Sequence, residues 1–145
     1  MNMRTVGIGA LLAAVLLAGA GIAAASGTRT DAGDRTGPLV VHIRIHFSRF
    51  EPGAIDVEPG QTVRFVVQNT DPIDHEFIVG DARVQAAHET GTEAHHEPRP
   101  GEISVPAGQT VVTTVTFPSR AGELLFGCHL PGHYAYGMRG SISIG

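Results

Sequence analysis

Cysteine is scarce in this chain, because Cys128 is the only one among 145 residues. A single thiol cannot form a disulfide within one chain. It is therefore half of an intermolecular disulfide, a reactive thiol or a metal ligand. A free thiol outside the cytoplasm is open to oxidation, and a bound metal would protect it.

Lysine is absent, and all ten basic residues are arginine. The formal net charge is -4 at pH 7. Nucleic-acid-binding domains typically carry a basic excess, so we expect no nucleic-acid partner.

Long apolar runs are confined to the start of the chain, where one run extends from Ile8 to Ala25. It follows Arg4 and ends in Ala23-Ala24-Ala25, the small-residue pattern at which secretory signals are cleaved. We expect residues 1–25 to be a signal peptide and the protein to be exported to the periplasmic or extracellular side of the membrane. The alternative is an uncleaved membrane anchor, because a run of this length just spans a bilayer. Membrane contact is expected only in that case.

Helical periodicity is missing from the rest of the chain. Residues 26–37 are polar and predict a flexible linker, so residues 38–145 should form the folded domain. Within it, short alternating runs are separated by turn residues. The runs that we predict as strands are Leu39–Phe47, Ala54–Val57, Thr62–Asn69, His75–Val79, Ile103–Val105, Gln109–Phe117, Glu123–Cys128 and Arg139–Ile144. About seven or eight such strands predict an all-β fold, a Greek-key antiparallel β-sandwich.

The stretch from Cys128 to Met138 carries the chemistry, with the spacing Cys-x4-His-x4-Met through His133. Thiolate and thioether ligands combined with imidazole favour copper, and two His, one Cys and a weak axial Met form a blue-copper site. Pro131-Gly132 and Gly137 supply the bends that such a loop needs. A second histidine must come from another strand, and His75 at a strand start is the best candidate.

This domain resembles the cupredoxins, the small type 1 blue copper proteins. The resemblance rests on FEPGAIDVEPGQTVRFVVQN, DHEF and FGCHLPGHYAYGMRGSISI. The ligand-loop spacing is similar to that of auracyanins and phytocyanins, whereas plastocyanin has a shorter Cys–His gap. The resemblance implies one type 1 copper per chain, with His75, Cys128 and His133 as equatorial ligands and Met138 as the axial one. Glu76 departs from plastocyanin and azurin, which have asparagine after the first histidine.

Other histidines have different expected roles. His42 and His46 lie on the outward face of the first strand, about 13 Å apart, and cannot share an ion. His129 should point away from the metal, because it follows Cys128 at a strand end.

The segment from Asp81 to Pro100 has little strand character, and Ala82 to His88 within it can form a short helix. Its length suggests a functional or disordered loop. Its histidines, His88, His95 and His96, lie among glutamates and form a candidate second metal site. The alternative is a solvated acidic loop. Such a segment also resembles a loop in bacterial cupredoxins linked to copper tolerance, although methionine is missing here.

The expected function is single-electron transfer between redox partners through a Cu(I)/Cu(II) centre. The resemblance implies weak, transient docking near His133, and we expect a monomer. Copper handling or resistance is the alternative, favoured by the His-rich loop. We expect no enzymatic activity, because the chain lacks the His-x-His pairs of multicopper oxidases and the second cysteine of a binuclear copper centre.

Overall fold

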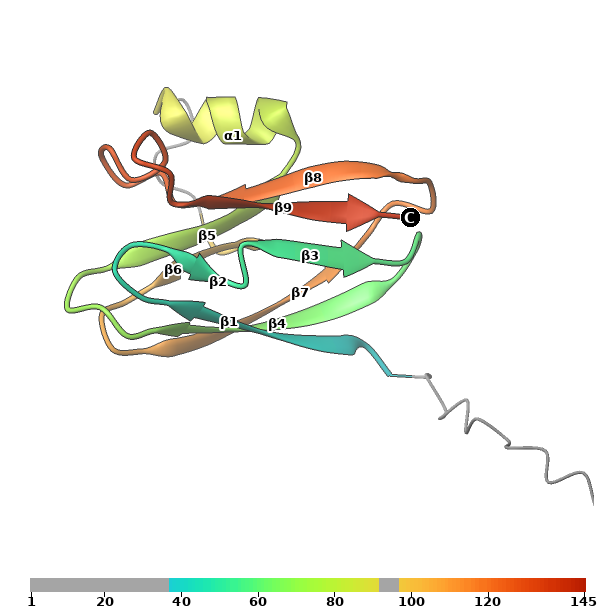
Figure 1. Ribbon diagram of the computed structural model, residues 1–145, viewed down its shortest axis with the longest axis horizontal. Coiled ribbons are helices and arrows are strands. Elements are labelled where there is room, and N and C mark those ends of the chain that lie inside the picture. Colours follow the sequence, from blue (N-terminus) through green and yellow to red (C-terminus); the bar gives the residue numbers. More distant parts are fainter. Residues whose placement is uncertain (1–36, 92–96) are drawn as a thin grey trace, which may run out of the picture. The chain divides into compact units, whose positions relative to one another are not determined.

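The computed structural model describes residues 37–91 and 97–145, in which two β-sheets enclose one core (Figure 1). One sheet has the strand order β2-β1-β4-β7, and the other has the order β3-β9-β8-β5-β6. The strands are β1 (Leu39–Ile45), β2 (Phe50–Glu51), β3 (Ala54–Val57), β4 (Thr62–Asn69), β5 (His75–Gly80), β6 (Glu102–Val105), β7 (Thr110–Thr116), β8 (Gly122–Gly127) and β9 (Arg139–Ile144). The predicted β-sandwich is therefore confirmed, with nine strands in the described residues.

Two strand pairs depart from the predicted antiparallel arrangement. β1 pairs with β4 in parallel, and β3 pairs with β9 in parallel, so both sheets are mixed. Each of these pairs joins strands that are not consecutive in the chain. Such pairing depends on tertiary packing, and local turn signals do not reveal it.

Alternation along the strands builds the core. In β4, Val63, Phe65 and Val67 are buried and alternate with exposed or half-buried residues, as a pleated strand requires. From the facing sheet, Phe77 of β5 packs with its ring centroid 5.3 Å from that of Phe65. Burial of these apolar side chains is the main driving force for closing the sandwich.

Phe47 is the clearest error in the predicted strand pattern. The sequence predicts that it points inward at the end of the first strand, but β1 ends at Ile45 and the Phe47 side chain is 80% exposed. Phe47 and Ser48 both have positive φ, so the backbone turns where a strand would continue. Phe50 and Glu51, which lie outside the predicted strands, form the short strand β2.

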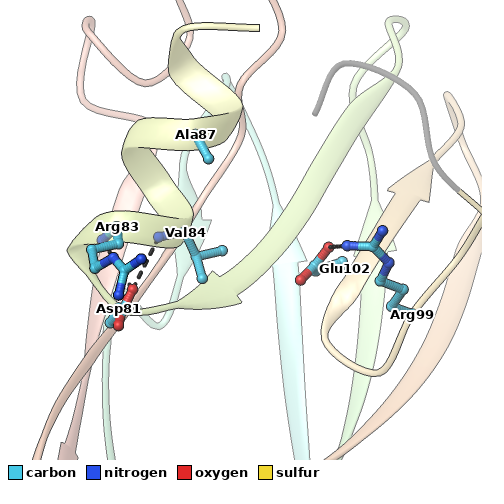
Figure 2. Close-up of a pocket in the computed structure, with 6 residues that line it drawn as sticks. All are labelled: Asp81, Arg83, Val84, Ala87, Arg99 and Glu102. Carbon is cyan, nitrogen blue, oxygen red and sulfur yellow. Dashed lines mark hydrogen bonds and ion pairs between the residues drawn. The ribbon is translucent and has the colours of Figure 1, made fainter. Parts of the chain in front are cut away.

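One helix, α1 (Ala82–Glu89), lies over the sheet and packs against β5 and β8 (Figure 1). It confirms the helix predicted near this position. Asp81 caps it, because its carboxylate accepts hydrogen bonds from the amides of Arg83 and Val84 (Figure 2). In the described ranges, no helix has the length and apolar character needed to cross a membrane.

Candidate metal centre

Strand pairing brings the distant ligand candidates together. His75 is the first residue of β5, and Cys128 directly follows β8. β5 and β8 are antiparallel neighbours, with Ile78 opposite Gly127. The side chains of His75 and Cys128 therefore meet at one end of the sheet although 53 positions separate them in the sequence.

The loop from Cys128 to Met138 is closed by its own backbone. The amide of Cys128 donates to the Met138 carbonyl at 3.1 Å, and the amide of Met138 donates to the His133 carbonyl at 2.9 Å. The amide of His133 in turn donates to the Leu130 carbonyl at 2.9 Å. Gly132 takes a φ of 85° in this turn, a conformation that glycine adopts without steric cost. Backbone hydrogen bonds thus link the three loop candidates to one another.

The three equatorial candidates point one donor atom each at a common centre. Nδ1 of His75 lies 3.3 Å from Nδ1 of His133, and Sγ of Cys128 lies 3.2 Å from Nδ1 of His133 and 3.9 Å from Nδ1 of His75. The point equidistant from these three atoms is about 2 Å from each, close to metal–nitrogen and metal–sulfur bond lengths in proteins. The three donors fit one metal ion without rearrangement.

Met138, the predicted axial ligand, stands at the end of the same loop. Its side chain is fully buried, and its backbone is bonded to both Cys128 and His133. His75 and Cys128 are also buried, whereas His133 is partly exposed. A site with one thiolate, two imidazoles and one thioether suits copper, which accepts soft ligands and cycles between two oxidation states.

Burial raises the pKa of the Cys128 thiol to about 11, although amide hydrogen bonds from Glu76 and Leu130 favour the thiolate. The Glu76 amide lies 3.3 Å from Sγ, so the glutamate that replaces the family asparagine still provides a backbone donor to the sulfur. Burial also lowers the pKa of His75, which keeps its imidazole neutral, as a metal ligand must be. A hydrogen bond to Asp71 partly opposes this effect.

The raised pKa of the Cys128 thiol predicts pH-dependent metal uptake. Between about pH 7.5 and pH 9.5 ordinary imidazoles are neutral, while this thiol is still protonated in the metal-free protein. Binding must then release one proton, and the apparent Cu(II) affinity should rise about tenfold per pH unit. Competition titrations at several pH values measure this slope. A flat profile would show that the thiol is already ionised without metal.

His129 lies away from the metal donors, as predicted, and its side chain is packed inside the protein. Its side chain is 2% exposed, and Nδ1 lies 2.9 Å from Glu89 Oε2 while Nε2 lies 2.8 Å from Gln85 Oε1. Its ring stacks on Tyr134 with centroids 4.6 Å apart. The residue after the cysteine therefore connects α1 to the ligand loop, a contact that no sequence signal indicated.

The candidate second metal site is only partly within the described residues. His88 is buried on α1, with Nδ1 donating to the Val84 carbonyl at 2.9 Å and Nε2 at 3.7 Å from Glu102 Oε2. His95 and His96 lie outside the described residues. Among those described, the sole group of three His, Cys, Asp or Glu donors within 4.8 Å is His75, Cys128 and His133. The second site stays a prediction.

A pocket between α1 and β6 is separate from the metal centre. It is lined by residues of both charges and two apolar side chains, namely Asp81, Arg83, Val84, Ala87, Arg99 and Glu102 (Figure 2). On the side opposite α1, Arg99 pairs with Glu102 at 3.5 Å (Figure 2). None of these residues is a copper-ligand candidate.

Known proteins resemble this chain in sequence and in fold. It is 36% identical to the copper-resistant cuproprotein CopI of Rubrivivax gelatinosus over 66% of this chain and 59% of that protein. It is 30% identical to CopI of Pseudomonas aeruginosa over 66% of this chain and 70% of that protein. The chain thus spans less than two thirds of the Rubrivivax protein's length.

Solved structures agree on the fold. Auracyanin B aligns with a TM-score of 0.62 and 22% identity, covering 78% of this chain and 93% of that one. Auracyanin A of Chloroflexus aurantiacus, described as a "blue" copper protein, aligns with a TM-score of 0.59 and 25% identity, covering 75% of this chain and all of that one. The model of copper binding proteins of the plastocyanin/azurin family matches residues 40–145, which are nearly all of the folded domain. The chain is therefore a cupredoxin, a copper-binding member of the plastocyanin/azurin family.

Proposed function

We propose that this protein serves copper resistance outside the cytoplasm, by holding a copper ion in its type 1 site. The observation that carries this proposal is the convergence of donor atoms from His75, Cys128 and His133 on one centre, with the buried Met138 hydrogen-bonded within the same loop. Copper bound there would be shielded from solvent on the side of Cys128 and Met138. Two relatives at 30% identity or more are named copper-resistant cuproproteins, which supports the same role.

The proposal includes export and excludes catalysis. The sequence of residues 1–25 is typical of a secretory signal, although these residues lie outside the described ranges. With Met138 as the axial ligand, the four donors would fill the positions of a type 1 site and leave none for a substrate. We therefore propose binding and oxidation-state change of the copper, without turnover of a small molecule.

Electron transfer is the second candidate, and one observation favours it. His133 is partly exposed while the other three donors are buried, so electrons would leave through its imidazole. The exposed ring of Tyr136 packs over Gly132 beside it and offers an apolar contact to a partner. Redox partners dock through small, weak interfaces of this kind.

A growth experiment tests the first proposal. Deleting the gene in its host should reduce growth in added copper, and the wild-type gene should restore it. The Cys128→Ser variant should fail to restore growth, because it lacks the thiolate. Equal restoration by Cys128→Ser would show that tolerance does not depend on this site.

The variant Tyr136→Glu separates the two candidates, because it leaves all four donors in place and changes only the exposed contact. If this variant keeps its copper spectrum and restores tolerance, copper holding is sufficient. If it keeps the spectrum and fails to restore tolerance, electron exchange with a docked partner is required.

A further inference from the structure

Asp71 has a buried carboxylate that contacts one of the metal-ligand candidates, His75, through a hydrogen bond. Its Oδ2 atom lies 3.0 Å from Nε2 of His75, and the two side chains are 7% and 0% exposed. A carboxylate accepts hydrogen bonds, so Nε2 of His75 must carry the proton. The other ring nitrogen, Nδ1, then has its lone pair directed toward Cys128 and His133.

Asp71 is held by more than its histidine partner. Its two oxygens also accept hydrogen bonds from the amides of Phe47 and Ser48, each at 2.8 Å. Both donors belong to the turn with positive φ, which is an uncommon conformation for residues other than glycine. Such a conformation persists where its surroundings fix it, and it often marks a functional site. Here it aims two amides at one carboxylate.

A second side chain fixes the backbone around Asp71. Oδ1 of Asn69 accepts from the Asp71 amide at 3.0 Å. Nδ2 of Asn69 donates to the carbonyls of Ile73 and Val105 at 2.8 Å and 2.9 Å. The loop before β5 is therefore anchored to β6, and the carboxylate cannot shift without breaking several buried hydrogen bonds.

We infer that Asp71 is a positioning residue for the copper centre, which holds His75 in the tautomer that ligates through Nδ1 and stabilises Cu(II) relative to Cu(I). A carboxylate bonded to the far nitrogen makes a ligating imidazole a stronger donor. Its negative charge, in a site of low polarity, also favours the more highly charged ion. This inference rests on the copper site alone and holds for either candidate function.

The chain offers a matched control for this charge. Asp74 is one residue from His75 and carries the same carboxylate, but it is exposed and accepts from the Ala107 amide at 2.9 Å. Asp71→Asn and Asp74→Asn each remove one negative charge close to His75. Only Asp71→Asn removes the carboxylate that the imidazole contacts.

The test measures Cu(II) affinity and reduction potential in both variants. Asp71→Asn should bind Cu(II) about 10–100-fold more weakly, the usual effect of losing a partner behind a ligating histidine. If Cu(I) affinity is unchanged, each tenfold loss raises the reduction potential by about 59 mV. Asp74→Asn should change Cu(II) affinity less than about twofold. Equal effects in the two variants, or none in Asp71→Asn, would overturn the inference.

A second measurement on the wild-type protein covers the case in which Asp71→Asn does not fold. Long-range ¹H–¹⁵N NMR of the Cu(I) form, which is diamagnetic, should show a slowly exchanging proton on Nε2 of His75. The metal-free protein should show the same tautomer, because Asp71 sets it independently of copper. A proton on Nδ1 in the metal-free protein would overturn the inference.

Discussion

Replacing Cys128 with serine should abolish the intense visible absorption of the Cu(II) protein. That absorption arises from charge transfer between thiolate and copper, and a hydroxyl does not supply it. Removing a residue that hydrogen-bonds to a metal ligand lowers affinity roughly 10–100-fold. The affinity for Cu(II) should fall by more than this in Cys128→Ser, because the substitution removes a ligand itself. Optical titration with Cu(II) and EPR spectra of the product measure both effects.

The fold should survive this change. Serine is close to cysteine in size. Its hydroxyl oxygen can accept a hydrogen bond from the Glu76 amide, which points at Sγ in the wild-type protein. We expect the free energy of unfolding of the metal-free variant to lie within about 1–3 kcal/mol of the wild-type value, the usual cost of changing a buried polar contact. Met138→Leu is the matched control in the same loop and should keep the visible band. An intensely coloured Cys128→Ser protein would exclude Cys128 as the thiolate ligand.

Replacing Phe77 with alanine should have the largest effect on stability. Its ring is fully buried, and the ring centroid lies 5.7, 5.3 and 5.4 Å from the centroids of Phe50, Phe65 and Phe126. These three rings come from both sheets. Truncation leaves a cavity where the sheets meet, and such changes cost about 3–5 kcal/mol. The total free energy of unfolding of a small domain is about 5–15 kcal/mol, so this substitution would remove much of the stability. Urea unfolding of the metal-free protein measures the difference.

Phe47→Ala is the control for this prediction. It makes the same chemical change at a side chain that is 80% exposed, so its cost should stay within about 0.5 kcal/mol. Similar losses in the two variants would show that the rings between the sheets do not hold them together.

Local patterns predicted the parts of the structure that depend on local sequence. The alternation in β4 indicated its buried face, and the Cys128–His133 spacing indicated a loop whose thiol and imidazole lie together. These signals are reliable because pleat and turn geometry act over a few residues.

Contacts between distant segments were not predictable in the same way. Asp71 precedes His75 by four residues, yet its role depends on amides of the turn at Phe47 and Ser48, which joins β1 to β2. His129 is buried because α1 covers it, which only the packed structure reveals. Phe47 continues an apolar alternation, but its positive φ directs its side chain outward. Each depends on tertiary packing that overrides the local pattern.

The two ends of the sandwich differ, because the domain begins and ends at one of them and the metal donors lie at the other. This difference matters when the protein is attached to a surface. Leu39 pairs with Val63 at one end of β4, whereas the loop around Asp71 follows the other end (Figure 1). β9 likewise starts beside Met138 and runs to the C-terminus, about 20 Å away at the usual rise per residue. If a linker at residue 38 or 145 tied the domain to an electrode, the loop from Cys128 to Met138 would face the solution. Orientation on a surface is thus built into the strand directions.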